Sequence, residues 1–196
     1  MKLAIYSGGI WKINGLAAFL PEYELVFKPG KNLAVDAVAG WGTKKAANFA
    51  MHEAARRNVP YIALEDGFLR SYGLGVNGAA PFSMVADDVG VYYDATRPSV
   101  LENLIMENDA GLTLRAELAM AEIKKYRLSK YNNSLEKWNL PKGRYVLVAD
   151  QCAGDQSIVK GMADAGSFAN MLAKAREENA GARIIIKTHP DVIAGK

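Results

Sequence analysis

Short apolar runs alternate with longer helix-like stretches along this chain, and that rhythm restricts the fold more than any other feature. Strand-like runs are expected at residues 3–6, 24–27, 34–39 and 59–64. A short helix is expected over 12–19, and a longer one from Thr43 as N-cap to about Asn58. Helices that cross over between strands are typical of parallel, doubly wound sheets, so the sequence predicts an α/β fold.

The pattern continues with shorter runs up to a boundary between about 128 and 143, after which the rhythm restarts. Residues 84–86 and 89–93 are short apolar runs that suit further strands. Thr96 or Ser99 is expected to cap a helix that carries Val100, Leu101, Leu104 and Ile105 on one face. A further helical pattern covers 114–131. Beyond the turn at 140–144, strands are expected at 145–149 and 183–187, with a helix at 167–178 that buries Phe168, Met171, Leu172 and Ala175. We therefore predict a Rossmann-like unit at 1–130 and the start of a second at 143–196. Two strands and one helix bury little surface, so we expect a fragment of a longer protein.

Composition excludes several classes of protein. The formal net charge is only +3 and the basic residues are scattered, which argues against nucleic acid as a partner. The single Cys152 cannot form an intramolecular disulfide and fits a reducing compartment. We see no signal peptide and no apolar segment near the roughly 20 residues of a membrane span. The expected location is the cytoplasm, with a peripheral position at the inner membrane through partners.

The usual chemistries of such a sheet lack their motifs. Neither the Gly-x-Gly-x-x-Gly fingerprint nor a P-loop is present, and there is no Gly-x-Ser-x-Gly elbow for a catalytic serine. A metal hydrolase would have to draw on Glu65, Asp66, Asp87, Asp88 and His189. However, the chain has only two histidines, and His52 lies within a predicted helix. No His-Glu-x-x-His or Cys-x-x-Cys spacing occurs, so we predict no metal centre.

Two strand ends carry reactive groups. After the strand at 59–64 come Glu65, Asp66 and a turn glycine, followed by Arg70, and ligands gather at the carboxyl ends of strands in open α/β sheets. The alternative is an ordinary turn whose acids are solvated and whose arginine pairs with one of them.

After the strand at 183–187 comes His189-Pro190. A proline suits the first helical position, so His189 would lie beside backbone N–H groups that favour a phosphate oxygen. Here the alternative is a strand-end histidine bonded to a backbone carbonyl.

Together these stretches resemble the paired motifs of the bacterial sialyltransferase and Kdo-transferase group. The chain is most similar to the KpsC/LipA type of capsule polysaccharide proteins, which are retaining β-Kdo transferases. The resemblance rests on residues 65–75 (EDGFLRSYGLG), 91–102 (VYYDATRPSVLE), 146–151 (VLVADQ) with 154–158 (GDQSI), and 187–192 (KTHPDV). It covers most of the chain from Trp41 onward.

The resemblance implies a GT-B-like fold, in which two Rossmann-type units enclose the site in a cleft. It also implies CMP-Kdo as donor with no further cofactor, a lipid-linked glycan as acceptor, and capsule assembly proteins at the inner membrane as partners. Transfer with retention suggests two displacements, so one carboxylate must attack the anomeric carbon. Members of this type continue past the His-Pro motif, so we expect the donor site of this chain to be incomplete.

The resemblance also suggests roles for individual residues. Asp66 is the candidate nucleophile and Glu65 an acid/base or orienting group, although the sequence does not separate the two acids. Arg70 is expected to clamp the Kdo carboxylate, and His189 to neutralise or protonate the departing phosphate. Further substrate-binding candidates are Gly67, Ser71, Gln151, Asp155, Lys187 and Pro190. Two other readings stay open: a non-catalytic Rossmann-type module in capsule assembly or export, and a nucleotide-sugar epimerase or dehydrogenase.

Overall fold

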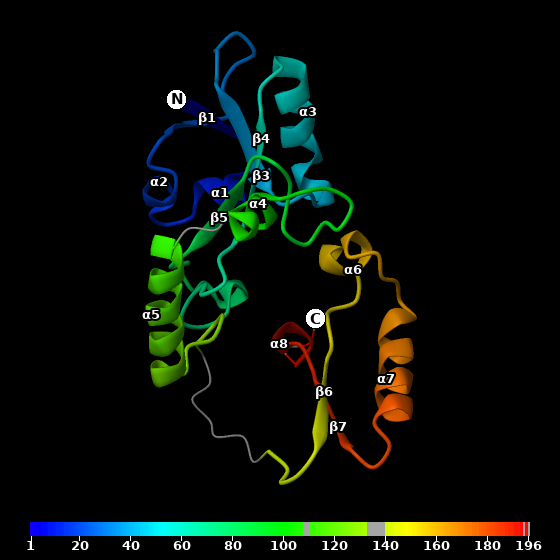
Figure 1. The fold of residues 1–196 in the computed structure, drawn as a ribbon. Coiled ribbons are helices and arrows are strands. Elements are labelled where there is room, and N and C mark those ends of the chain that lie inside the picture. Colours follow the sequence, from blue (N-terminus) through cyan, green and yellow to red (C-terminus); the bar gives the residue numbers. More distant parts are fainter. Residues whose placement is uncertain (108–109, 133–139, 194, 196) are drawn as a thin grey trace. The chain divides into compact units, whose positions relative to one another are not determined.

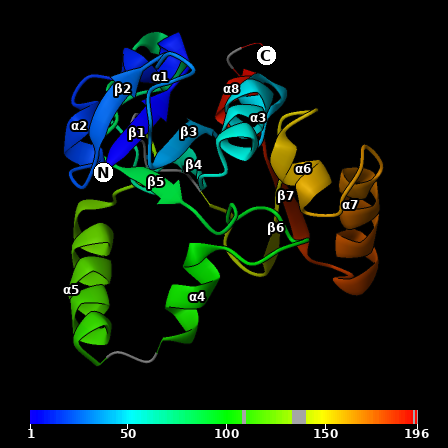
Figure 2. The same ribbon diagram turned by 90° about the horizontal axis from the view of Figure 1, so that it is seen from above.

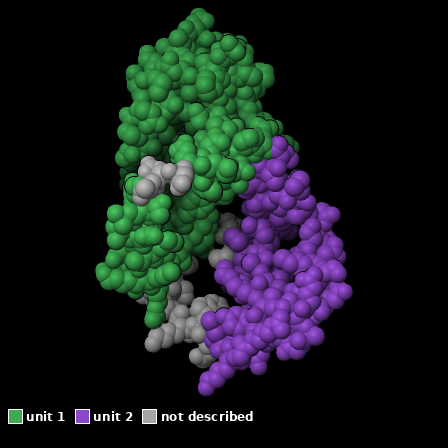
Figure 3. Space-filling view, in the orientation of Figure 1, with its two compact units in different colours: residues 1–92, 97–135 green, residues 93–96, 136–196 purple. Residues whose placement is uncertain are grey.

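The structure is a computed structural model that describes residues 1–107, 110–132, 140–193 and 195. The chain divides into two compact units, the first formed by residues 1–92 and 97–135 and the second by 93–96 and 136–196 (Figure 3). Residues 93–96 therefore group with the second unit although their neighbours in the chain belong to the first. Residues 133–139 of the predicted boundary region lie outside the described residues.

The first unit is built on a five-stranded sheet in the order β2-β1-β3-β4-β5 (Figure 1). Its strands are β1 (Lys2–Ile5), β2 (Glu24–Phe27), β3 (Ala37–Trp41), β4 (Tyr61–Asp66) and β5 (Met84–Asp87). The first four strands run parallel, and β5 pairs antiparallel with β4 at the edge. This mostly parallel sheet confirms the predicted α/β class.

Both faces of this sheet are covered, which explains the nearly continuous apolar character of its central strands. On one face, Ile10 of α1 (Gly8–Trp11) and Leu16 of α2 (Leu16–Phe19) pack against Leu3, Ile62 and Leu64 of the sheet. On the other face, α3 (Asn48–Arg57) packs against Ala4 and Val38 through its alanines 50 and 54. Even-numbered residues of β4 thus face α1 and α2, and odd-numbered residues face α3.

Several elements differ in detail from the sequence-based expectation. The helix expected over 12–19 is two short helices, because Gly15 adopts a left-handed conformation with φ of 73° where α2 begins. Thr43 does not cap α3: a 3-10 helix, η1 (Lys45–Ala47), precedes it, and Asn58 ends it in a left-handed conformation. The third strand starts at Ala37, three residues later than expected. Residues 89–93 form a loop rather than a strand.

Past the sheet, the first unit continues through η2 (Gly75–Asn77), α4 (Val100–Met106) and α5 (Ala110–Tyr126). Ser99 caps α4 in a capping box with Glu102, which confirms one of the two predicted caps. Of the apolar residues expected on one face of α4, Leu104 and Ile105 are exposed. The helix predicted at 114–131 corresponds to α5, which begins and ends a few residues earlier, at Ala110 and Tyr126.

The second unit begins a second parallel sheet. Its strands β6 (Tyr145–Ala149) and β7 (Arg183–Lys187) pair in parallel, as expected, and its helices are α6 (Gln156–Lys160), α7 (Ser167–Glu178) and α8 (Pro190–Ile193). Helix α7 packs beside β6 (Figure 2). Its apolar residues are less buried than expected, and Met171 is exposed. No helix in the described ranges is both long and apolar enough to cross a bilayer.

Candidate functional site

The two acids at the end of β4 point to opposite faces of the sheet. Both Glu65 and Asp66 are strand residues, and side chains alternate between faces along a strand. Glu65 is therefore on the α3 side and is buried, with 8% of its surface exposed. Asp66 is on the other side, with 28% of its side chain exposed. Since they diverge, the two carboxylates do not form a facing pair, which the sequence did not reveal.

Asp66 is held by Arg70, four residues further on. The Arg70 Nε lies 2.8 Å from Asp66 Oδ1, and the arginine side chain is only 12% exposed. Its Nη1 donates to the Ser71 hydroxyl and to the carbonyl of Ala79, each at 2.9 Å. Gly75 makes this possible, because a Cβ there would overlap the guanidinium. The arginine that the resemblance offered as a sugar clamp thus binds the loop that follows β4.

Gly67 and Ser71 also have structural partners. A Cβ on Gly67 would overlap the side chain and backbone of Ser83, and the Gly67 amide donates to the Ser83 carbonyl at 3.1 Å. Ser71 is fully buried, and its hydroxyl donates to the Gly73 carbonyl at 2.7 Å. The loop after β4 is therefore a tightly bonded segment, which holds the Asp66 carboxylate in a defined place.

In the second unit, the loops that follow β6 and β7 meet. Ala149 and Lys187 are partners in the parallel register, so the residues after them start at the same edge. There the Cys152 Sγ lies 3.1 Å from His189 Nδ1. Gln151 accepts the Cys152 amide and donates to the Ser157 hydroxyl at 3.3 Å. The sequence placed His189 and Gln151 on these loops but gave Cys152 no part beside the histidine.

The other candidates of this unit have mixed roles. Asp155 is the N-cap of α6 and accepts from the Ser157 amide at 2.8 Å, which is a structural use of its carboxylate. Lys187 is the exposed last residue of β7. Pro190 begins α8, as its position after His189 predicted. The amides of Val192 and Ile193 donate to the His189 carbonyl, so the histidine stands where the helix starts.

The second unit contains an ion pair between Asp94 and Lys160 that the sequence did not predict. The Asp94 carboxylate is fully buried and lies 2.8 Å from the Lys160 ammonium. Its other oxygen accepts from the Thr96 hydroxyl at 2.6 Å. The hydrogen bond from Lys160, followed by that from Thr96, lowers the pKa of Asp94 to about 2. Asp94 lies in the family motif at 91–102, but no local pattern in the sequence pointed to Lys160 as its partner.

The predicted catalytic residues are divided between the units. Asp66, Glu65 and Arg70 belong to the first unit, and His189 and Gln151 to the second. Within the described residues, no cluster of three or more His, Cys, Asp or Glu side chains has the arrangement of a metal site. The convergence of the two groups on one donor sugar remains a prediction.

Sequence comparison supplies the family. Residues 36–134 and 110–196 match the family described as capsule polysaccharide biosynthesis protein. The chain belongs to this family. Among curated proteins of similar sequence, the capsule polysaccharide modification protein LipA of Neisseria meningitidis serogroup A is 45% identical to this chain over 98% of this chain's length. It is 38% identical to the lipopolysaccharide-processing protein LpsZ of Rhizobium meliloti over 79% of its length. The chain spans only 28% of LipA and 37% of LpsZ.

Solved structures of the family extend the likeness to the fold. KpsC of Thermosulfurimonas dismutans, described as a beta Kdo 2,4 transferase, superimposes with a TM-score of 0.90 and 44% identity over the whole chain. A second KpsC structure, described as a beta Kdo 2,7 transferase, gives a TM-score of 0.63 with 26% identity over 97% of the chain. The chain covers 62% of each of those chains. The predicted kinship with the KpsC/LipA type is thereby confirmed.

Proposed function

We propose that this chain is part of a retaining β-Kdo transferase that uses CMP-Kdo and extends a lipid-linked capsule glycan. The observation that carries the proposal is the match to the beta Kdo 2,4 transferase, because it combines 44% identity with a TM-score of 0.90 over the entire chain. We further propose that the reaction needs no metal and no cofactor besides the donor. Capsule assembly proteins at the inner membrane are the proposed partners.

Asp66 is our candidate for the nucleophile. Its side chain is partly exposed at the end of β4, and the Arg70 Nε, 2.8 Å from Asp66 Oδ1, holds the carboxylate in a fixed orientation. Attack on the anomeric carbon would break its bond to the CMP phosphate and form a glycosyl ester, which the acceptor hydroxyl then displaces. Glu65 is buried on the opposite face, so it suits an acid/base or orienting role toward a ligand bound on the α3 side.

His189 is proposed to stabilise the departing CMP phosphate. The ring stands at the start of α8, at the shared edge of β6 and β7, where loops of open α/β sheets bind ligands. Since Nδ1 faces Cys152 at 3.1 Å, we assign the phosphate contact to Nε2. An imidazole there would donate to a phosphate oxygen as negative charge develops on it.

Trapping the glycosyl ester tests this proposal. The complete gene product that contains these residues is incubated with CMP-Kdo and without acceptor, and its peptides are mapped by mass spectrometry. We expect one Kdo residue on the peptide that contains Asp66. We also expect Asp66→Asn to lower transfer by about a hundredfold or more, because an amide cannot attack the sugar. His189→Gln should slow formation of the ester by about ten- to a hundredfold.

Glu117→Gln is the matched control, because Glu117 is an exposed carboxylate on α5. This variant should transfer Kdo at the unchanged rate. An adduct on Glu65 would contradict the assignment of Asp66 but keep the double displacement. Product formation without any adduct, undiminished in Asp66→Asn, would contradict the mechanism. A complete protein that transfers no Kdo from CMP-Kdo would favour the alternative of a non-catalytic assembly module.

A further inference from the structure

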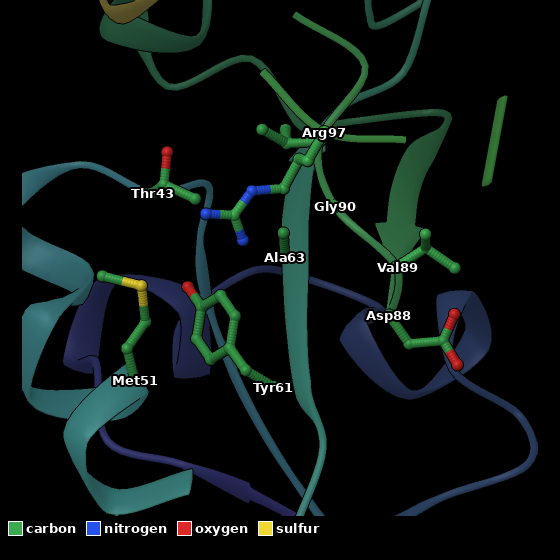
Figure 4. Close-up of a pocket in the computed structure, with 9 residues that line it drawn as sticks. Thr43, Met51, Tyr61, Ala63, Asp88, Val89, Gly90 and Arg97 are labelled. Atoms are coloured by element: carbon green, nitrogen blue, oxygen red, sulfur yellow. The ribbon is translucent and has the colours of Figure 1, made fainter. Parts of the chain in front are cut away.

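Two places in the molecule bring together polar side chains that the proposed reaction does not use. One is a cavity of about 200 Å³ in the first unit, on the face of the sheet that α3 covers, with Thr43 and Arg97 among its lining residues (Figure 4). Asp66 is on the opposite face of that sheet, and Arg97 already has an interaction within the chain. The other place is the contact between Cys152 and His189 in the second unit, which involves a candidate for the reaction itself.

The backbone of Cys152 is held on both sides of the residue. Its amide donates to Gln151 Oε1 at 2.8 Å, and its carbonyl accepts from the Asp155 amide at 3.1 Å. Gln151 also donates to the Ser157 hydroxyl at 3.3 Å, and Asp155 caps α6. The turn that presents the thiol is therefore tied to the start of α6.

The backbone of His189 is held as well. The Asp150 amide donates to the Lys187 carbonyl at 3.0 Å, which joins the two strand ends beyond their last register pair. The His189 carbonyl accepts from the amides of Val192 and Ile193 at 3.0 and 3.2 Å. These bonds place the Cα and Cβ atoms of the histidine. They do not set the orientation of its ring, because χ2 of histidine has only a broad, roughly two-fold preference.

The thiol is placed to set that orientation. Its Sγ lies 3.1 Å from His189 Nδ1, and both side chains are half-buried, so water shields this contact only in part. A neutral imidazole has a donor at one ring nitrogen and an acceptor at the other, and a thiol can donate or accept. When the Cys152 S–H donates to Nδ1, the ring proton is on Nε2. Nε2 is the nitrogen that we assign to the departing phosphate.

We propose that Cys152 is a positioning residue, which holds His189 in the tautomer and orientation that let Nε2–H donate to the phosphate of CMP. The thiol proton stays on sulfur, and the reaction makes no bond to sulfur. If the ring becomes charged, Nδ1–H donates and the sulfur accepts, so the contact persists in both states of the imidazole. This inference rests on the proposed function, because it explains how the proposed phosphate ligand is aimed.

Servine and cysteine at this position separate two roles that a thiol beside a histidine can have. A thiol in such a pair can also act as a nucleophile. A serine hydroxyl can donate to and accept from Nδ1 as the thiol does, but it is a much weaker nucleophile than a thiolate. Cys152→Ser therefore keeps the reaction if the thiol positions the ring, and loses it if the thiol attacks the sugar.

The rate at which the glycosyl ester forms tests the proposal. It is measured in a single turnover with the complete gene product and CMP-Kdo, without acceptor. We expect Cys152→Ala to lower this rate about three- to tenfold, as for the loss of one neutral hydrogen bond. Cys152→Ser should stay within about twofold of the wild type. In a His189→Gln background, Cys152→Ala should have no further effect, because the ring on which the thiol acts is gone. A merely structural role of Cys152 would slow both backgrounds equally.

Nucleotide binding gives a second readout, which needs no catalysis. CMP is titrated into the same proteins by calorimetry, and cytidine is measured by competition with CMP, so that the ratio of the two affinities reports on the phosphate. We expect Cys152→Ala to lower the affinity for CMP about threefold or more and to leave that for cytidine unchanged. Cys152→Ser should restore the value for CMP.

Met171→Ala is the matched control, because Met171 is another sulfur-containing side chain of the second unit, exposed on α7. This variant should bind CMP and form the ester as the wild type does. A rate for Cys152→Ser as low as that for Cys152→Ala would overturn the positioning role. Kdo attached to the peptide that contains Cys152 would overturn it as well.

The two proposals fail separately. A wild-type protein that neither binds CMP nor forms the ester contradicts the proposed function, and the thiol loses its role with it. A wild type that does both, with CMP binding and ester formation lowered by His189→Gln but unchanged in a folded Cys152→Ala, contradicts the role of the thiol alone. The fold of each variant is checked by its melting temperature.

Discussion

Asp94 shows how strongly one side chain can depend on its partners. Its buried carboxylate accepts from Lys160 and Thr96, and its pKa falls from 3.8 to about 2. A lowered pKa in the folded state means that the carboxylate stabilises the fold above pH 4, and that this stabilisation is lost as the pH falls toward 2. We expect Asp94→Asn to reduce the free energy of unfolding by about 1–3 kcal/mol at pH 7. Urea unfolding at pH 7 and pH 3 should show the deficit shrinking at the lower pH.

Glu117→Gln again serves as control for Asp94→Asn, since it removes an exposed carboxylate and should change stability little at either pH. A deficit of equal size at pH 7 and pH 3 would show that the charge of Asp94 is not what stabilises this segment.

At the same scale, the buried hydroxyl of Thr43 should lower the stability of the fold. Replacement by valine removes a buried hydroxyl that has no partner among the described residues and preserves the shape of the side chain. We expect Thr43→Val to raise the free energy of unfolding of the ligand-free protein by about 1 kcal/mol, measured by thermal denaturation. A destabilised Thr43→Val would mean that the hydroxyl already has a partner in solution.

At the scale of elements, the end of β4 depends on the loop that follows it. Gly67 is placed so closely against Ser83 that any Cβ would collide with backbone atoms. We expect Gly67→Ala to lower the free energy of unfolding by about 1–3 kcal/mol and to displace the Asp66 carboxylate, so that both stability and Kdo transfer fall. Gly8→Ala is the control, because a Cβ there has no atom within 4 Å. If Gly67→Ala left the free energy of unfolding unchanged, Ser83 and β5 would have to shift at no cost to make room for the added Cβ.

At the scale of the whole molecule, the proposed reaction requires the two units to share one ligand. Asp66 belongs to the first unit and His189 to the second. In the proposed reaction, Asp66 attacks the sugar and His189 contacts the phosphate that leaves it. We expect a crystal structure of the complete gene product with a CMP-Kdo analogue to show both side chains in contact with that ligand. An analogue bound to His189 with Asp66 on a surface that does not reach it would refute the assignment of the nucleophile.

Much of the fold and part of the candidate site could be predicted from local patterns. The apolar runs at 24–27, 145–149 and 183–187 became strands with the expected bounds, since strand formation there follows from a short stretch of sequence. Where helices begin proved harder to predict. The left-handed Gly15 splits one expected helix in two, and a single residue of this kind is invisible to an apolar periodicity.

By itself, the sequence determined most of the strands, the α/β class, the positions of Glu65, Asp66 and His189 near the ends of strands, and the kinship with the capsule polysaccharide biosynthesis family. Each of these features depends on a short continuous stretch of the sequence. Only the tertiary structure decided that Arg70 is bonded within its own loop, that Cys152 touches His189, and that residues as distant as 43, 61 and 97 enclose one cavity. Such contacts join parts of the chain that no local pattern relates, because packing of the sheet and its loops brings them together.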